Sequence, residues 1–529
     1  MSKYDIVVMG AGHNGLVAAA YLAKAGKKVL VLERKAWPGG GVATRELTLP
    51  GFWHDEHSNV HIMIQGNPLI REDELGLMSK YGLKYFWNDT PHCSLFIDGT
   101  VLFTYKDLDK TCASLATVSP KDAETYRAFA LKSQQMLPMI VSGLYSPPLP
   151  LGAMIAMMDQ SDEGREMFDF MSRSAIDICN QMFESDKVKM HFWRMITENL
   201  QAPDDLGTGM GMLLMPGIIH SWGVSAPIGG SGKLTESLVR CIEAFGGEVR
   251  CNAEVKRVLV SGGKATGVEL SSGEIIQAKD AVIGAIHPHR LRAFVEGVTE
   301  PVLGRAERVN TSPFSIMLSH YALSEKVKYR FGGPDVSKAA MIEYIGTTKQ
   351  SELLDDFDNM RRGRMPIERP LCAGGDSSHF DPTRVPEGKG IFYGVTFGPF
   401  ELADGGHARW DEVKEELADV SLAHYRKFIS NMEDENILAR KVFSPVDMER
   451  SSPNSMVRGD LHGAAPYLYQ VMGHRPTPDL GQYTVPGIDG FYLVGPFMHP
   501  GGGVYGAGRA TAIKMFDDMG IDFDKVVRK

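Results

Sequence analysis

The sequence predicts an α/β protein in which a discontinuous, doubly wound sheet domain carries an inserted α+β domain. Three features favour this fold class. The N-terminus has the pattern strand, glycine turn, helix and strand, and the C-terminus ends in a strand, a glycine loop and a helix. Between them lie long helical patterns and a series of short strands. Because a glycine turn that leads into a helix marks the ligand side of a doubly wound sheet, we expect both ends to join one sheet.

The first segment, residues 4–33, predicts a right-handed βαβ unit. The apolar run YDIVVM leads into GAGHNG, and the Ala-rich helical pattern that follows ends at Gly26. The run KKVLVLE then predicts the second strand. This order of elements is typical of a parallel sheet.

The middle of the chain predicts helices first and strands later. Residues 66–224 hold long, Met-rich helical patterns, and a helix between Gly229-Gly230 and Gly246-Gly247 precedes a series of short strands with hairpin turns. Residues 300–475 mix strands with one amphipathic helix. We therefore assign residues 1–65, 225–290 and 476–529 to the sheet domain, and residues 66–224 and 291–475 to the inserted domain.

The composition is that of an ordinary globular protein and narrows the range of functions. Of 529 residues, 43% are apolar and 23% are charged, and the net charge is −9. No run of five or more basic residues is present, so nucleic acid is excluded as a partner. The six cysteines form no Cys-x-x-Cys pair, which argues against a disulfide reductase and favours a cytoplasmic location. The first strand begins at Tyr4, so we expect no secretory signal.

Two uncharged stretches, residues 133–158 and 206–232, are long enough to suggest membrane spans. Prolines and glycines interrupt both, so we expect them to be buried or to line a channel. Both are rich in methionine. Flexible thioethers suit an adaptable apolar channel, and they suit ordinary core packing equally well.

Three glycines form a Gly-x-Gly-x-x-Gly fingerprint between the first strand and the first helix. Gly10 permits the tight turn, Gly12 allows a pyrophosphate to approach the backbone, and Gly15 allows close helix packing. Glu33, at the end of the second strand, is positioned to accept hydrogen bonds from a ribose, and its charge disfavours a 2′-phosphate. The sequence therefore predicts a dinucleotide site that disfavours NADP. A second fingerprint is absent, so we expect no separate nicotinamide domain.

Longer segments at both ends and in the middle of the chain resemble one family. They are GAGHNGLVAAAYLAKAG with VLVLERKAWPGG, then APIGGSGKLTESLVRCIEAFGGEVRCNAEVKRV, and finally GIDGFYLVGPFMHPGGGVYGAGRATA. These segments are similar to the phytoene-desaturase-like flavoproteins, including the branch of the pyridine nucleotide-disulfide oxidoreductase domain 2 proteins. The resemblance implies a glutathione-reductase-like Rossmann domain with FAD as the cofactor.

The same resemblance implies a set of cofactor-binding residues. They are Gly10, Gly12, His13, Asn14, Gly15 and Glu33 for the ADP half, Arg34, Gly39, Gly40, Gly41 and Val42 near the pyrophosphate, Val255 facing the adenine through its backbone, and Gly495, Gly503 and Val504 beside the ribityl chain and flavin ring. One departure is visible. Several desaturases have Arg directly after the glycine pair, where this chain has Gly41, so the positive charge is absent or comes from Arg34 or Arg45.

The C-terminal loop has physical features that suit a flavin. Three consecutive glycines follow Pro500, so the backbone can pass flat against a planar ligand. A helix predicted to start near Ala507 directs its positive end toward that ligand. Because a reduced flavin gathers negative charge near N1 and the C2 carbonyl, this helix end would stabilise the reduced form and favour substrate oxidation.

The candidate catalytic residues are His57, His499 and Tyr505. Histidines cluster at residues 54–61, and His499 and Tyr505 flank the glycine loop. A ketone that loses an α-proton needs a base such as histidine or tyrosine, whereas a polyene can lose an allylic hydride first. We expect no metal, because the histidines lack nearby cysteines or an HExxH helix.

The sequence thus favours an FAD-dependent dehydrogenase or desaturase that introduces a C=C bond into an apolar polyene or alicyclic ketone by hydride transfer to flavin N5. The alternatives are an amine or alcohol oxidase on the same scaffold, a redox-neutral isomerase, and a flavin-loaded binding protein without turnover. Oxygen or a quinone is the expected electron acceptor. The sequence leaves a peripheral membrane contact and a homo-oligomer open.

Overall fold

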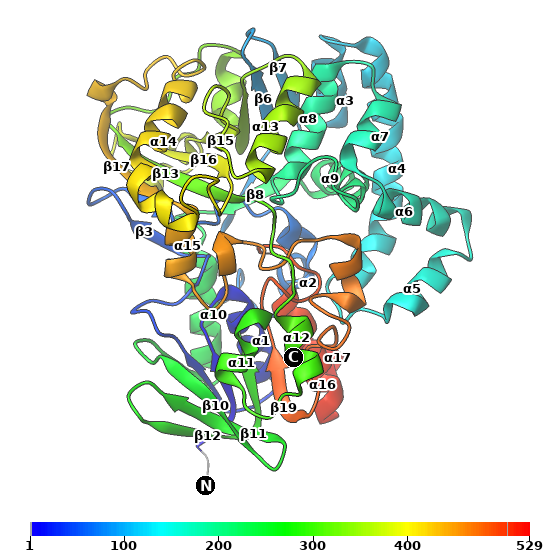
Figure 1. Ribbon diagram of the computed structural model, residues 1–529, viewed down its shortest axis with the longest axis vertical. Coiled ribbons are helices and arrows are strands. Elements are labelled where there is room, and N and C mark those ends of the chain that lie inside the picture. Colours follow the sequence, from blue (N-terminus) through cyan, green and yellow to red (C-terminus); the bar gives the residue numbers. More distant parts are fainter. Residues whose placement is uncertain (1–2, 505, 529) are drawn as a thin grey trace.

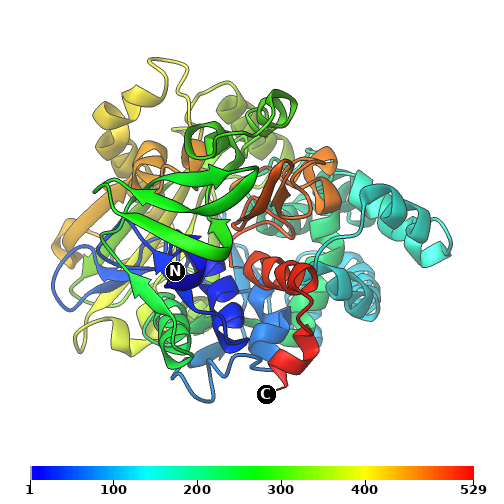
Figure 2. The same cartoon turned by 90° about the horizontal axis from the view of Figure 1, so that it is seen from below.

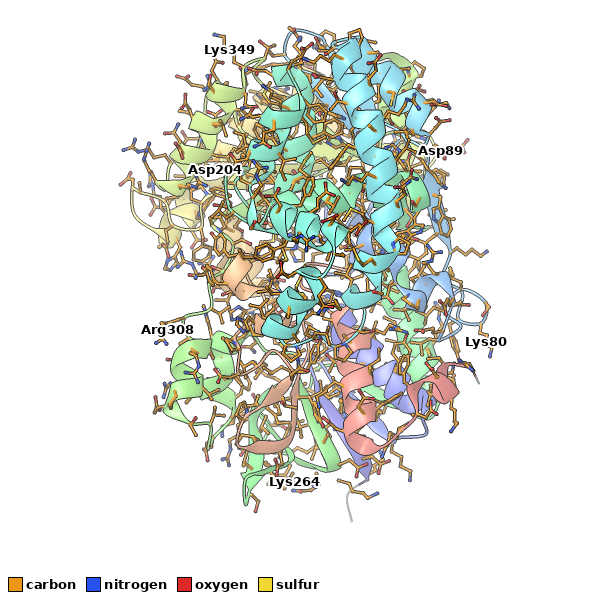
Figure 3. All side chains as sticks on the ribbon, turned by 90° about the vertical axis from the view of Figure 1, so that its right-hand side faces the viewer. Lys80, Asp89, Asp204, Lys264, Arg308 and Lys349 are labelled. Atoms are coloured by element: carbon orange, nitrogen blue, oxygen red, sulfur yellow. The ribbon has the colours of Figure 1, made fainter. Side chains whose placement is uncertain are left out.

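The protein is described by a computed structural model that covers residues 3–504 and 506–528. It has two bodies, each built around one large sheet (Figure 1). The lower body in Figure 1 holds an eight-stranded sheet, and the upper body holds a seven-stranded sheet and most of the long helices. Charged side chains such as Lys80, Lys264 and Lys349 lie on the outside of both (Figure 3).

The eight-stranded sheet joins segments from both ends and the middle of the chain. Its order is β10-β11-β19-β12-β1-β2-β9, and β18 pairs with β19. The strands are β1 (Tyr4–Met9), β2 (Val29–Leu32), β9 (Glu248–Arg250), β10 (Val255–Ser261), β11 (Lys264–Leu270), β12 (Ile275–Gly284), β18 (Thr484–Val485) and β19 (Ile488–Leu493). β1, β2, β9, β12 and β19 run parallel, whereas β10, β11 and β12 form the predicted hairpins. The predicted discontinuous doubly wound fold is confirmed.

Side chains of β1 alternate between two packed faces of this sheet. Ile6 and Val8 pack with helices α1 (His13–Lys24), α10 (Gly232–Ala244) and α16 (Ala507–Met519). Val7 and Met9 pack on the other face with α11 (Leu291–Phe294) and α12 (Glu300–Ala306). Burial on both faces explains why the strand is a nearly continuous apolar run. Figure 2 shows α16 beside α1, which brings the two glycine-turn units together.

The seven-stranded sheet belongs to the inserted part of the chain. Its order is β17-β13-β16-β15-β14-β6-β7, and its pairs are antiparallel except for β14 with β6. The strands are β6 (His92–Phe96), β7 (Val101–Thr104), β13 (Ser315–Leu323), β14 (Met341–Ile345), β15 (Cys372–Gly375), β16 (Gly390–Gly398) and β17 (Ile437–Phe443). This mixed sheet with its helices is the predicted α+β domain.

Alternating residues of β13 also separate two layers. Ile316 and Leu318 pack with Trp193 of α8 (Asp186–Thr197) and Leu213 of α9 (Gly209–Trp222). Met317 points the other way and packs with α14 (Trp410–Tyr425). The helical layer also contains α3 (Leu108–Ala116), α4 (Pro120–Leu144), α6 (Asp162–Ser172), α7 (Ala175–Met182) and α13 (Gln350–Arg361).

The two uncharged stretches have different environments. Residues 206–232 form the largely buried α9 and the short strand β8 (Val224–Pro227), as expected. Residues 133–158 include the end of α4 and helix α5 (Leu151–Met158), which projects from the body (Figures 1 and 2). There Met139 and Met157 are 44% and 55% exposed, so the expectation of burial is wrong for this part, because nothing described packs on its outer side. No helix in the described ranges is long and apolar enough to cross a membrane.

Candidate functional site

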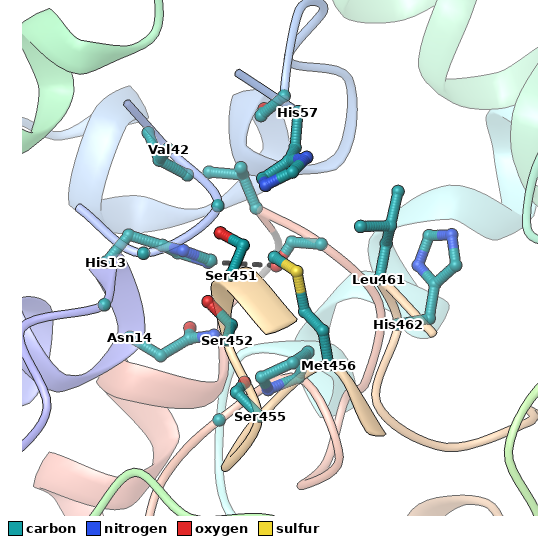
Figure 4. A pocket seen from close by; sticks show the side chains of 18 of the residues that line it. His13, Asn14, Val42, His57, Ser451, Ser452, Ser455, Met456, Leu461 and His462 are labelled. Atoms are coloured by element: carbon teal, nitrogen blue, oxygen red, sulfur yellow. Dashed lines mark hydrogen bonds between the residues drawn. The ribbon is translucent and has the colours of Figure 1, made fainter. Parts of the chain in front are cut away.

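One cavity of about 390 Å³ connects the two sheets. Its wall contains the glycine turn between β1 and α1, the end of β2, and the inner face of the seven-stranded sheet. Figure 4 shows His13, His57 and Met456 around the same space, although they come from distant parts of the chain. The cavity therefore links the predicted dinucleotide site to the inserted domain.

The end of the cavity near Glu33 is arranged to bind an anionic dinucleotide. Glu33 is buried, its Oε2 accepts a hydrogen bond from the backbone N–H of Ala11 at 2.9 Å, and its Oε1 accepts one from Lys35 N–H at 2.9 Å. These bonds fix the carboxylate, whose remaining lone pairs can accept ribose hydroxyls. No side chain caps the N-terminus of α1, so its free N–H groups are available to a pyrophosphate.

The glycines of the turn are required for packing and for access. A Cβ on Gly15 would lie 2.7 Å from the carbonyl oxygen of Gly10, so α1 could not approach the turn so closely with any other residue. By contrast, a Cβ on Gly12 would meet no protein atom within 4 Å. That space is part of the cavity, and together with the fixed Glu33 carboxylate it fits the ADP half of a dinucleotide cofactor.

Most of the predicted cofactor residues line this cavity. They are Gly10, Gly12, His13, Asn14, Gly15, Glu33, Arg34, Gly40, Gly41, Val42, Val255, Gly495, Gly503 and Val504. Gly39 was predicted to lie beside the pyrophosphate, but it lies behind the cavity wall. Its N–H donates to the Ala11 carbonyl at 2.8 Å, and a Cβ there would lie 2.5 Å from the carbonyl oxygen of Val42. Gly39 therefore shapes the turn from behind.

Arg34 and Lys35 bring positive charge to the wall of the cavity. Both line the cavity, and both contact Ser451: Arg34 donates to its carbonyl oxygen at 2.6 Å and Lys35 to its hydroxyl at 2.8 Å. Burial lowers the pKa of Lys35. Arg45, the other predicted source of charge, stacks on Trp37 at 3.6 Å and is outside the wall. Residues 451–456 also line the cavity, and no sequence pattern indicated this loop.

Three histidines surround the middle of the cavity. His13 donates from Nε2 to the carbonyl oxygen of Gly503 at 3.0 Å, and His61 Nδ1 lies 2.9 Å from the Tyr85 hydroxyl. Both ring nitrogens of His57 and the Nε2 of His61 are buried and have no hydrogen-bond partner among the described residues. Burial lowers the pKa of His13 to about 4 and those of His57 and His61 to about 3, so all three rings are neutral at pH 7.

Of the other two predicted catalytic residues, the structure describes only His499. Contrary to the prediction of a catalytic role, His499 is buried outside the cavity. There its Nε2 donates to the carbonyl oxygen of Gly143 at 3.0 Å. That bond ties the ring to the end of α4. Tyr505 lies outside the described residues. The predicted helix after the loop is α16, and no side chain caps its first turn.

The far end of the cavity is an apolar chamber in the inserted domain. It is lined by Met195, Leu200, Met215, Ile316, Ala340, Met341, Val395, Phe397 and Leu461, with Glu198, Asn199, Tyr393 and His462 as polar members of the wall. Met215 therefore lines the chamber, whereas Met212 of the same helix packs in the core. The sequence left both roles open for methionine, and both occur. The sequence did not indicate the strand residues of this wall, because they lie within ordinary β-strand patterns.

Comparison with known proteins agrees with this geometry. A family model described as "Flavin containing amine oxidoreductase" matches residues 15–511. Similar proteins include one subunit of the limonene dehydrogenase of Castellaniella defragrans (27% identical, over 99% of this chain and 96% of that protein), pyridine nucleotide-disulfide oxidoreductase domain-containing protein 2 of Rattus norvegicus (26%, 98% and 94%), and the lycopene-forming phytoene desaturase of Pantoea ananas (24%, 97% and 99%). The family resemblance seen in the sequence is confirmed.

The fold is also found among solved structures. Wild-type putrescine oxidase bound to putrescine is 17% identical, with a TM-score of 0.59 over 99% of both chains. At this identity the similarity concerns the fold alone. It supports the arrangement of one Rossmann-like sheet and one separate, mainly antiparallel sheet.

Proposed function

Since the chain belongs to the flavin containing amine oxidoreductase family, we propose that it is an FAD-dependent dehydrogenase that introduces a C=C bond into a largely apolar substrate. The observation that carries this proposal is the single cavity that joins the dinucleotide-binding turn to an apolar chamber. The names of two relatives, limonene dehydrogenase and phytoene desaturase, support dehydrogenation of apolar carbon skeletons. Bound FAD would supply a two-electron acceptor for hydride at N5 of its ring.

The residues of this chain would position the cofactor and the substrate. Glu33 would hold the ribose, and the free N–H groups at the start of α1 would bind the pyrophosphate, as the fixed carboxylate and the open space over Gly12 allow. Gly503 and Val504 would lie beside the ring, toward which α16 directs its N-terminus. The apolar chamber would exclude water from the reacting carbon atoms.

Desaturation removes a hydride and a proton from neighbouring carbon atoms. With FAD bound as the hydride acceptor, the electron pair of the second C–H bond would form the C=C bond, and the proton of that bond would pass to a base. His57 is suited to this task because its buried ring is neutral and both its nitrogens lack a hydrogen-bond partner in the part of the chain that the structure describes. Oxygen or a quinone would then reoxidise the flavin.

An amine oxidase is the second candidate function. The description of the family model and the fold of putrescine oxidase favour it, and Glu198 could pair with an ammonium group. Most of the remaining chamber wall is apolar, which favours a carbon skeleton instead.

Anaerobic mixing of the purified, flavin-loaded protein with candidate substrates separates these functions. Limonene, a polyene or an alicyclic ketone is expected to bleach the flavin absorbance, and the product should have lost two hydrogen atoms. Bleaching by primary amines alone would replace the proposal with an amine oxidase. A product of unchanged mass would identify an isomerase, and a flavin that no compound reduces would indicate a binding protein.

A further inference from the structure

Arg475 is among the largest side chains that the fold buries completely. It is 1% exposed and lies in the segment that precedes β18. An arginine side chain does not lose its proton in a protein, so the positive charge stays inside the fold. Because little water screens a buried charge, it acts strongly on the groups around it.

Three backbone carbonyl oxygens hold the guanidinium group. Arg475 Nη2 lies 3.1 Å from the oxygen of His462, 2.9 Å from that of Ala464 and 2.8 Å from that of Pro496. These carbonyl groups fix the guanidinium but carry no net charge of their own. His462 and Pro496 both line the cavity. Arg475 therefore lies directly behind the cavity wall.

The glycine loop, residues 501–503, packs against the same guanidinium group. A Cβ on Gly501, which has φ +93°, would lie 2.5 Å from Nε and 2.6 Å from Cζ of Arg475, so a larger residue would collide with it. By contrast, a Cβ on Gly503 would meet no protein atom within 4 Å, and Gly503 lines the cavity. The loop thus contacts the buried charge at one glycine and the cavity at another.

Three buried histidine rings near Arg475 are neutral. Burial lowers the pKa of His287, His462 and His499, and the positive charge of Arg475 lowers each of them further. The pKa of His499 falls to about 4. At pH 7 these rings therefore add no positive charge of their own.

Asp460 is the acid that acts on the same His462 ring. Its carboxylate accepts the backbone N–H groups of Ser312 at 2.7 Å and of His462 at 2.8 Å. No hydrogen bond joins Asp460 to residues 501–503, all of which the structure describes. Arg475, which packs against Gly501, is therefore the charged group that this loop contacts from behind.

A flavin ring on the cavity side of the loop would respond to this charge. A hydride accepted at N5 leaves one additional negative charge on the ring, near N1 and the C2 carbonyl. A nearby positive charge stabilises that reduced form more than the neutral oxidised form. The N-terminus of α16 contributes a partial positive charge at the same loop, and Arg475 adds a full one.

We propose that Arg475 raises the reduction potential of the bound flavin and keeps the reduced ring anionic, acting through the glycine loop. This inference rests on the proposed function, because it requires FAD with its ring against that loop. Removal of two hydrogen atoms from adjacent carbon atoms needs a more oxidising flavin than oxidation of an alcohol does. The charge of Arg475 therefore suits the proposed reaction.

Three variants of the FAD-loaded protein test the inference. Arg475→Gln keeps an N–H donor for the carbonyl oxygens but removes the charge, whereas Arg475→Lys keeps the charge and loses the planar guanidinium. Arg308→Gln is the control, because it removes one positive charge from the exposed surface (Figure 3). Equilibration with a redox dye measures the flavin potential, and the absorbance spectrum of the reduced flavin shows whether its ring is anionic or neutral.

The charge and not the side-chain shape is expected to determine the potential. Arg475→Gln should weaken the binding of reduced FAD relative to oxidised FAD by about tenfold or more, which lowers the potential of this two-electron couple by about 30 mV or more. At about pH 6 the reduced flavin should be anionic in the wild-type protein and largely neutral in the Gln variant. Arg475→Lys should keep most of the potential, and Arg308→Gln should keep all of it.

An unchanged potential in Arg475→Gln would overturn the inference. Equal shifts in the Gln and Lys variants would also overturn it, because the hydrogen bonds of the guanidinium would then matter and not its charge. If Arg475→Gln takes up no FAD, a reduced wild-type flavin that is neutral at about pH 6 overturns the inference, and an anionic one with an unchanged potential in Arg475→Lys supports it. Wild-type protein that binds no FAD contradicts the proposed function instead, so the two failures are distinguishable.

Discussion

Replacement of Gly12 by Ala separates cofactor binding from folding. Gly12 has φ −65° and ψ 156°, which alanine adopts without strain, and a Cβ there meets no protein atom within 4 Å. The FAD-free protein should therefore keep its stability or gain about 0.4–1 kcal/mol from the lower entropy of the unfolded chain. The new methyl group would instead occupy the space proposed for the pyrophosphate.

The expected loss of FAD affinity follows from that contact. Forcing a methyl group into a packed site costs about 1–3 kcal/mol, which corresponds to a loss of about fivefold to 150-fold in affinity. FAD titration followed by flavin fluorescence measures the affinity, and thermal unfolding of the FAD-free protein measures stability. Gly15→Ala is the matched control, because its Cβ would lie 2.7 Å from the Gly10 carbonyl oxygen and should destabilise the fold itself.

Two outcomes would refute this reasoning. If Gly12→Ala binds FAD as tightly as the wild-type protein, the pyrophosphate does not lie against the turn. If Gly12→Ala and Gly15→Ala destabilise the FAD-free protein equally, the turn does not have the geometry that the structure shows.

Three further predictions concern buried polar groups. His57→Phe should slow flavin reduction about a hundredfold or more at unchanged FAD content, and an unchanged rate in rapid mixing would exclude His57 as the base. Arg194→Met should lower the free energy of unfolding in urea by about 3–5 kcal/mol, because the buried Glu343 carboxylate then has no positive partner. The double variant Arg194→Met with Glu343→Met should recover most of that loss. If it does not, the result argues against the ion pair. His61 and His92 have pKa values of about 3 in the folded protein, so below pH 6.5 the unfolded chain binds more protons than the folded chain. The free energy of unfolding should therefore fall by about 1.4 kcal/mol per pH unit for each ring as the pH is lowered. A Tm that stays constant from pH 7 to 5 would contradict this.

The dinucleotide end of the site could be predicted because its determinants are local. The glycines of the turn and Glu33 occur within one βαβ unit, and each residue type follows from a backbone or hydrogen-bonding requirement at its own position. The C-terminal loop was predicted for the same reason, since Gly503 and the start of α16 are neighbours in the chain. The hairpin turns at residues 262–263 and 272–273 likewise depend on local glycines.

The substrate end could not be predicted, because tertiary packing assembles it. Glu198, Met341 and Tyr393 come from a helix end and two strands, and nothing in their neighbouring residues shows that they face one cavity. His499 shows the opposite problem: proximity to the glycine loop in sequence suggested a catalytic role, but a hydrogen bond to Gly143 directs its ring elsewhere. The exposure of α5 also depends on what packs around it rather than on its own apolar sequence.

A crystal structure of the protein grown with FAD tests the central claim most directly. We expect one FAD per chain, with its adenosine beside Glu33 and Val255 and its ring between Gly503 and His57, facing the apolar chamber. An FAD whose ring lies outside that chamber, or a protein that takes up no FAD, would contradict this claim.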